Sequence, residues 1–191
     1  MRAFKKLAVA AALATTLPAF ADVVFLTFEG IGDQAPVGNY YNGGGGPNYG
    51  VSFSDATLAI IDADAGGTGN FANEPSPDTI MFFLEANNAI LNVAAGFDTG
   101  FSFYYSSVAA ATVTVWDGVD GTGNLLGSID IEGQYNIGCT GDPSGAFCNW
   151  TAIGVAFAGT AKSINFGGTA NQTGYDNITF GADVPVIPEP S

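Results

Sequence analysis

The sequence predicts an all-β fold: a sandwich of two antiparallel sheets, with a jelly roll as the expected form and a simpler Greek-key sandwich as the alternative. Three observations predict it. The 27 glycines punctuate the chain at short intervals, aromatic residues are plentiful, and apolar residues alternate with polar ones along short runs. No apolar pattern repeats every 3.6 residues over enough length to predict a helix instead.

Eleven short runs are candidate strands, each bounded by turn residues. Two of them alternate most clearly, because Phe101, Phe103 and Tyr105 share one face of their run, as Val113 and Val115 do in the next. The candidate strands are 22–28, 51–54, 57–61, 79–85, 89–94, 100–107, 111–118, 125–131, 151–157, 162–166 and 176–180. So many strands in one domain need two packed sheets.

Residues 1–21 are predicted to be an export signal. Basic residues at positions 2, 5 and 6 precede an apolar run of about 14 residues, and the Ala-Phe-Ala sequence at 19–21 offers a cleavage site. A membrane anchor is the alternative, but a bilayer span needs about 20 apolar residues. We therefore expect an exported protein whose mature form begins at Asp22.

The mature chain is strongly acidic. It retains Lys162 alone against all 18 carboxylates of the sequence, a formal net charge of −17. Such a charge repels phosphate groups, so the sequence predicts no nucleic-acid partner and no binding to anionic lipid headgroups. Cations are favoured, and the charge also keeps an exported domain soluble.

Cys139 and Cys148 are predicted to form a disulfide. They are the two cysteines of the sequence, they frame a loop that contains proline and glycine, and the chain is expected to be exported. A metal site would need more cysteines or some histidine, and the sequence has no histidine. The bridge is expected to stabilise by about 2.5 kcal/mol in the chain-entropy account.

The same lack of histidine excludes Ser-His-Asp and Cys-His catalysis. Paired carboxylates, which many β-sandwich glycosidases use, remain as the catalytic alternative. Asp130 and Glu132 share a strand face, but their spacing is more typical of a solvated strand edge. We predict a protein that is not an enzyme, with a carboxylate-dependent glycan-cleaving enzyme as the alternative.

A tyrosine-rich loop at 38–50 is a candidate carbohydrate-binding site. Tyr40, Tyr41 and Tyr49 surround four consecutive glycines. Displayed tyrosines can stack on sugar rings; alternatively, they cover the end of the sandwich, which is the interpretation we favour. Trp116 and Trp150 are expected in the core or at a sheet edge.

Carbohydrate-binding modules with a jelly-roll fold resemble this chain in general form, and that resemblance implies a structural calcium ion where the first and last strands meet. Glu29 follows the first candidate strand and Asp176 opens the last. A second candidate site is Asp62 with Asp64, although the sequence after them departs from an EF-hand loop. The alternative for both sites is aspartates that bond their own turn backbone.

The export signal, the glycine-rich sandwich, the last strand GYDNITFG and the tail DVPVIPEPS together resemble bacterial PEP-CTERM proteins. In that family the sequence Pro-Glu-Pro, here Pro188, Glu189 and Pro190, opens a sorting tail that an exosortase handles. The tail continues into a hydrophobic helix and a basic cluster, which do not follow Ser191 in this sequence. The resemblance implies exosortase machinery as a partner and a cell-surface or extracellular location.

These observations divide the sequence into a signal peptide at 1–21, a β-sandwich domain at 22–181, and a proline-rich linker with the start of the sorting motif at 182–191. The expected function is that of a non-catalytic surface or matrix protein whose domain binds carbohydrate, with extracellular polysaccharide as the partner. The sequence does not identify the glycan.

Overall fold

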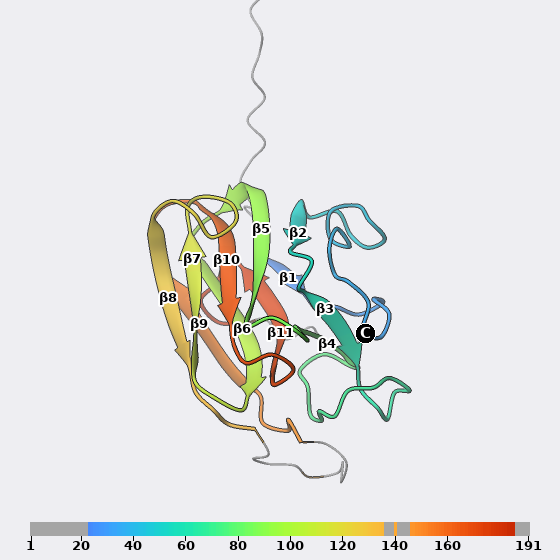
Figure 1. Ribbon diagram of the computed structural model, residues 1–191. Helices are drawn as coiled ribbons and strands as arrows, with labels where there is room; N and C mark the ends of the chain where they lie inside the picture. The colour runs from blue at the N-terminus through green and yellow to red at the C-terminus, as the bar shows by residue number, and fades with distance from the viewer. Residues whose placement is uncertain (1–22, 136–139, 141–145, 186–191) are drawn as a thin grey trace, which may run out of the picture.

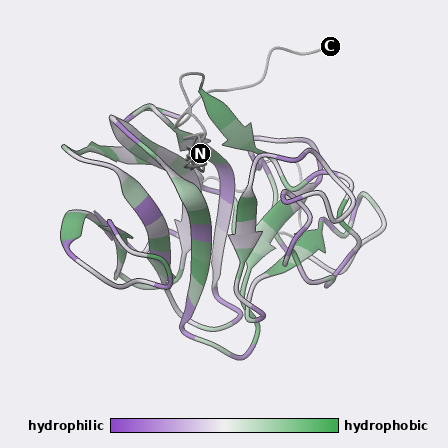
Figure 2. Cartoon of the chain, turned by 90° about the horizontal axis from the view of Figure 1, so that it is seen from above, coloured by the Kyte–Doolittle hydropathy of each residue, from purple (hydrophilic) through white to green (hydrophobic). Residues whose placement is uncertain are grey.

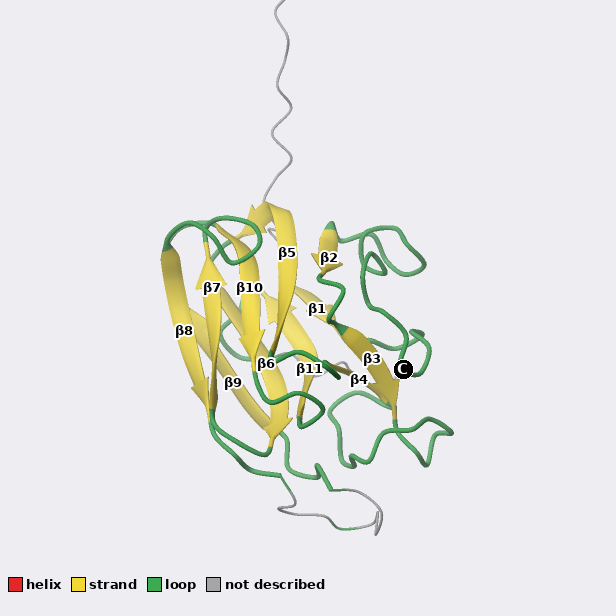
Figure 3. Cartoon of the chain, in the orientation of Figure 1, coloured by secondary structure: helices red, strands yellow, loops and turns green. Residues whose placement is uncertain are grey.

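The computed structural model describes residues 23–135, 140 and 146–185. These residues form eleven strands in two facing antiparallel sheets and no helix (Figures 1 and 3). Within the described residues no helix has the length and apolar character that a membrane span requires. The predicted signal peptide, Cys139 and the Pro188–Pro190 motif lie outside the described residues.

The two sheets contain strands from all parts of the chain. The first sheet has the order β3 (Leu58–Ile61), β4 (Thr79–Phe82), β11 (Thr173–Phe180), β6 (Gly100–Ser107), β9 (Thr151–Ala156), and β1 (Val24–Leu26) also pairs with β11. The second has the order β2 (Val51–Phe53), β5 (Asn88–Phe97), β10 (Ala161–Gly167), β7 (Ala111–Trp116), β8 (Leu125–Ile131).

The pairing pattern is that of a jelly roll. β7 pairs with β8, β6 with β9, β5 with β10 and β4 with β11, all antiparallel. The four pairs are nested around the turn at 117–124, so the chain forms one long hairpin that is rolled into a sandwich. The predicted fold class is confirmed.

All eleven predicted strands are confirmed, with several changes of length. β1 (Val24–Leu26) and β4 (Thr79–Phe82) are shorter than the predicted 22–28 and 79–85. β5 extends from Asn88 to Phe97, beyond the predicted 89–94. β11 begins at Thr173 instead of 176, because Gly174 and Tyr175 pair with β4 on one side and with β6 on the other. The glycine at 174 hid this extension in the sequence, since glycine weakens a strand pattern.

The core lies between the sheets and is built of aromatic rings. Phe101, Phe103 and Tyr105 point inward as predicted, as do Val113 and Val115. Phe166 of the second sheet contacts Tyr175 of the first, with ring centroids 4.9 Å apart. Figure 2 shows hydrophobic residues recurring along the strands of both sheets. The apolar residues of these strands therefore face the core and the polar residues that alternate with them face outward, as predicted.

The outer face of the first sheet is covered in part by other segments. Ser102 of β6 donates a hydrogen bond to the Ala182 carbonyl oxygen (2.9 Å). Gly154 of β9 allows the Asp183 backbone to approach, since a Cβ there would lie 2.3 Å from the Asp183 carbonyl oxygen. Residues 182 and 183, which we predicted to belong to the linker, therefore pack on the domain. The segment 62–78 lies over another part of the face and forms one side of the site described next.

Candidate functional site

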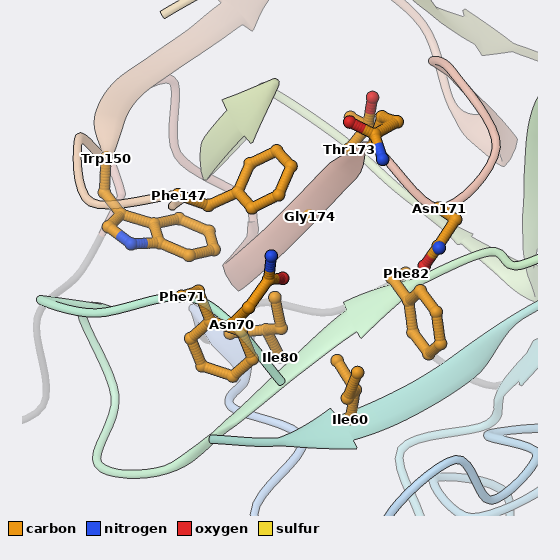
Figure 4. A pocket seen from close by; sticks show the side chains of 11 residues that line it. Ile60, Asn70, Phe71, Ile80, Phe82, Phe147, Trp150, Asn171, Thr173 and Gly174 are labelled. Atoms are coloured by element: carbon orange, nitrogen blue, oxygen red, sulfur yellow. The ribbon is translucent and has the colours of Figure 1, made fainter. Parts of the chain in front are cut away.

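A small pocket opens on the outer face of the first sheet (Figure 4). Ile60 of β3 and Ile80 and Phe82 of β4 form its floor. They point outward because Ala59 and Met81, which alternate with them, pair with each other and lie in the core. Ile80 and Phe82 are nevertheless buried. β4 is thus apolar on both faces, which requires a cover on its outer side.

Two loops supply that cover and the aromatic wall of the pocket. The loop at 69–72 contributes Phe71, and the loop at 146–150 contributes Phe147 and Trp150. The loops are joined by a parallel bridge between Phe71 and Phe147 and by the Ala72 amide, which donates to the Phe147 carbonyl (3.2 Å). In Figure 4 Phe147 and Trp150 lie on one side of the pocket, opposite Asn171 and Phe82.

Trp150 is held in one orientation. Its indole Nε1 donates to the Ala72 carbonyl oxygen (3.1 Å), and its ring meets Phe71 edge to face at a centroid distance of 6.2 Å. Gly174 on β11 makes room for it, because a Cβ there would lie 3.2 Å from the Trp150 ring and 2.6 Å from Ile80. The indole is half-buried, so part of its surface faces the pocket.

The rim of the pocket is polar and uncharged. Asn70, Asn171 and Gln172 line it, and their side-chain amides form no hydrogen bond to any described residue. Thr173 also lines it, but its hydroxyl is engaged with Ser107 and with the Thr169 amide. No ionisable side chain lines this pocket among the described residues. The site can therefore bind a ligand through apolar contact and hydrogen bonds, but it offers no group for proton transfer.

The pocket is shallow. Its volume is about 40 Å³, which is room for a few water molecules. It can seat the edge or one face of a small ring while the remainder of a larger ligand stays in solvent.

A second pocket, which is acidic, is lined by the next residues of the same segment, 72–74. Asp62, Asp64, Glu74 and Asp78 line it, in a volume of about 380 Å³. Burial raises the pKa of Glu74 to about 7, and the charges of Asp62, Asp64 and Asp78 add to the shift. The sequence pointed to Asp62 and Asp64 but missed Glu74 and Asp78, because the fold of segment 62–78, and no regular spacing, brings the four together.

Glu29, which follows β1, and Asp176 of the neighbouring strand β11 both bind the segment 76–79. Asp176 is fully buried and accepts hydrogen bonds from the Ser76 amide (2.9 Å), the Ser76 hydroxyl and the Asn177 amide (2.7 Å). Burial raises the pKa of Asp176 to about 8, and the Glu29 charge raises it further.

The Glu29 carboxylate binds the same short segment as Asp176. It accepts hydrogen bonds from the Thr79 amide (2.9 Å), the Asp78 amide (3.2 Å) and the Thr79 hydroxyl (3.2 Å). The two carboxylates thus hold residues 76–79 against strands β1 and β11. These residues follow the loop at 69–72, which forms part of the wall of the first pocket.

The oxygens around Asp176 fit the preference of calcium for hard ligands. The next residue on β11, Asn177, is also fully buried, and its side-chain Oδ1 and Nδ2 have no hydrogen-bond partner among the described residues. However, no three side chains of Asp, Glu, His or Cys within the described ranges are grouped so that they could hold a metal ion. Calcium here would need amide and backbone oxygens to complete its shell.

The predicted tyrosine site is mostly a packing feature. Tyr41 is 3% exposed, and its hydroxyl accepts the Phe28 amide (2.7 Å). A ring so buried leaves no face for a sugar, which corrects the prediction for this residue. Tyr40 donates to the Glu29 carbonyl (3.1 Å), and Tyr49 stacks on Tyr41. Both are half-buried, and for them sugar contact stays a prediction.

Of the remaining sequence candidates, Cys148 is buried within the wall loop at 146–150. Cys139 lies outside the described residues, so their pairing stays a prediction. Asp130 is exposed and accepts a hydrogen bond from Thr112 (2.9 Å), as expected of a solvated strand face. Trp116 is on the second sheet, and its Nε1 donates to Thr114 (2.9 Å).

Comparison with known proteins gives matches of fold only. No family profile and no curated protein sequence matches the chain. Among solved structures, a family 6 carbohydrate-binding module is 16% identical, with a TM-score of 0.41 over 68% of this chain and 85% of the module. The module CBM6cm-2 of Cellvibrio mixtus lichenase 5A, solved with cellotriose, is 16% identical, with a TM-score of 0.38 over 66% of this chain and 87% of the module.

The K1 adhesin domain of Lys-gingipain from Porphyromonas gingivalis is also similar. It is 13% identical, with a TM-score of 0.44 over 85% of this chain and 99% of the domain. Identities this low show no shared ligand, so function must be argued from the pocket itself.

Proposed function

We propose that this domain is a non-catalytic carbohydrate-binding domain and that a sugar residue binds in the pocket on the outer face of the first sheet. The observation that carries this proposal is the combination of an aromatic wall with unengaged amides at the rim. A sugar ring presents apolar C–H groups on its faces and hydroxyl groups around its edge. The rings of Trp150 and Phe147 can contact the C–H groups. The side-chain amides that line the rim can form hydrogen bonds with the hydroxyl groups; they belong to Asn70, Asn171 and Gln172.

The amides also explain why this pocket favours a polyol over a purely apolar ligand. Each amide group has donors and an acceptor, and none is engaged by another described residue. A bound sugar exchanges water for direct hydrogen bonds, each of which contributes about 0.5–1.5 kcal/mol net. An apolar ligand that covered the same rim would leave these groups unsatisfied.

Replacing Asn171 and Gln172 together by alanine is expected to weaken glycan binding about tenfold or more, because two hydrogen-bonding groups are lost. Both side chains stand at the rim, so the domain should remain folded. A glycan array would identify a ligand, and calorimetry would compare the variant with Asn88→Ala, a matched amide change on the second sheet. Equal affinities of the wild-type domain, the double variant and Asn88→Ala for the glycan would refute this site.

Release of reducing sugar should be measured on the same glycans. If a glycan is cleaved and a single Asp or Glu substitution abolishes the cleavage, the domain is a carboxylate-dependent enzyme and not a binding domain.

We also propose that a calcium ion binds at Glu29 and Asp176. At about 10 mM calcium and a dissociation constant of about 0.1 mM, a value within the range of extracellular modules, binding would stabilise the native state by about 2.7 kcal/mol. The melting temperature should then rise by several degrees. Magnesium, which retains its waters, should give much less.

Melting curves in chelator, calcium and magnesium test this proposal. Asp176→Ala should lose the calcium response, and Asp64→Ala in the acidic pocket is the comparison that assigns the site. Equal shifts with both ions would indicate charge screening and no specific site. A calcium response that Asp64→Ala alone removes would move the ion to the acidic pocket.

Export to the cell surface or extracellular matrix completes the proposal, with exosortase handling of the tail and extracellular polysaccharide as partner. The intact mass of protein expressed with its leader into a periplasm should show loss of residues 1–21 and of two hydrogens, the latter from a bridge between Cys139 and Cys148. Retention of the leader would contradict export, and two alkylated thiols under non-reducing conditions would contradict the bridge.

A further inference from the structure

We propose that the pocket selects glycans by charge: it accepts neutral sugars and rejects those that bear uronate, sulfate or phosphate groups. This inference rests on the carbohydrate-binding function proposed above and names its substrate class. Three features of the described residues lead to it: the uncharged lining, the carboxylates beside the wall, and the position of the lysine.

The lining offers no positive charge to offset the dehydration of an anion. Its floor and wall are isoleucine, phenylalanine and tryptophan side chains, and its polar groups are neutral amides. A carboxylate that enters such a site loses water and gains no opposite charge, which is strongly unfavourable. The hydroxyl groups of a neutral sugar lose much less hydration free energy, and the amides can replace their hydrogen bonds with water.

The segment 70–74 places negative charge directly beside the wall. Asn70 and Phe71 line the sugar pocket, whereas Ala72, Asn73 and Glu74 line the acidic one. An anionic ligand in the first pocket therefore approaches the carboxylates of the second. Repulsion between exposed charges extends over about 10 Å at an ionic strength of 0.1 M, so these groups act on the ligand through the wall.

Among the described residues, no cation on this side of the domain offsets the repulsion. Lys162 is the one basic residue in the described part of the chain. It belongs to β10 in the second sheet, and its charge acts on Asp117 at the turn after β7. Sites that recognise carboxylate, sulfate or phosphate groups use Arg or Lys side chains for charge-assisted hydrogen bonds, and this pocket has neither.

The test compares neutral oligosaccharides with their C6-carboxylated forms, in chelator so that no divalent ion bridges the charges. Cello-oligosaccharide and galacto-oligosaccharide, each with its oxidised counterpart, serve as probes together with any neutral ligand that the array identifies. The oxidised form is expected to bind about tenfold more weakly at about 0.01 M salt, and the difference should narrow toward 1 M salt. Affinity for the neutral form should stay constant.

Removing charge from the acidic pocket should reduce the discrimination. The double variant Asp64→Asn, Glu74→Gln is expected to bind the oxidised glycan about threefold more tightly at low salt and to leave neutral binding within about twofold. Asp130→Asn on the second sheet removes one negative charge far from the site and should change the affinity for neither the oxidised nor the neutral glycan.

The outcomes separate the two proposals. If neutral and oxidised forms bind equally at low salt, or the oxidised form binds better, charge selection is overturned while carbohydrate binding stands. If the double variant at Asp64 and Glu74 binds the oxidised glycan no more tightly than Asp130→Asn does, the acidic pocket does not repel anionic glycans, and the inference that it does is overturned. If no neutral glycan binds at any salt concentration, the proposed function itself fails.

Discussion

Phe166→Ala is expected to lower the free energy of unfolding by about 3–5 kcal/mol. Phe166 is fully buried and belongs to the second sheet, but its ring meets Tyr175, Phe101 and Phe103 of the first at centroid distances of 4.9, 5.7 and 5.9 Å. Truncation opens a cavity at the contact between the two sheets. The loss is comparable with the whole stability of a marginal domain, about 5–15 kcal/mol.

Chemical denaturation of the variant beside Val119→Ala measures this effect. Val119 is 41% exposed, so its truncation should change the stability by less than about 0.5 kcal/mol. A loss below about 1 kcal/mol for Phe166→Ala would show that this ring does not join the sheets as described.

In the absence of calcium, the domain is expected to become less stable as the pH rises from about 4 to about 8. The cause is Asp176, whose folded pKa is about 8, chiefly through burial, with a further increase from Glu29. An unfolded aspartate has a pKa of about 3.9. Between these values the native state holds a proton that the unfolded state has lost, so stability falls by up to about 1.4 kcal/mol per pH unit.

The neighbouring groups set the pH window for this measurement. Glu74, with a pKa of about 7, contributes in the same direction. Asp33 acts in the opposite direction, because hydrogen bonds from Ile61 and Thr68 outweigh its desolvation and lower its pKa. Its contribution is lost only as the pH falls below about 4. Measurements between pH 5 and 7 therefore report Asp176 and Glu74 together, and those between pH 7 and 8 report mainly Asp176.

Denaturation midpoints in chelator across this range test the expectation, with Asp176→Asn as the matched variant. The amide has no charge to lose, so it should flatten most of the slope between pH 7 and 8 and reduce the slope at lower pH. A wild-type stability that stays constant or increases toward pH 8 would contradict the burial of Asp176 as described. Added calcium should diminish the slope as well, since a bound cation favours the carboxylate.

The strands could be predicted from the sequence because the pattern that defines them is local. Alternation in the runs around Phe103 and Val113 revealed which side faces the core, and the number of strands required two sheets. The order of strands was less accessible, because the pairs β4 with β11 and β5 with β10 join distant segments. No local pattern in the sequence specifies these partners.

The sugar pocket could not be predicted in the same way. Its aromatic wall requires two loops, distant in the sequence, that meet through the pairing of Phe71 with Phe147 and the contacts of Trp150, and its floor requires β4 to be apolar on its outer face. The apolar run IMF at 80–82 was the available signal, since a strand buried on both faces implies a cover. Trp150 was expected in the core or at an edge, and no local pattern placed it at a pocket.

The central claim, that a sugar binds in the pocket on the first sheet, is tested most directly by following side-chain signals in a nuclear magnetic resonance titration with a neutral oligosaccharide. We predict saturable shifts of the Trp150 indole and of the side-chain amides of Asn70, Asn171 and Gln172, while amides of the second sheet, such as Asn88, stay unchanged. Shifts confined to the second sheet or to the loop at 38–50, with the Trp150 indole unaffected, would contradict it.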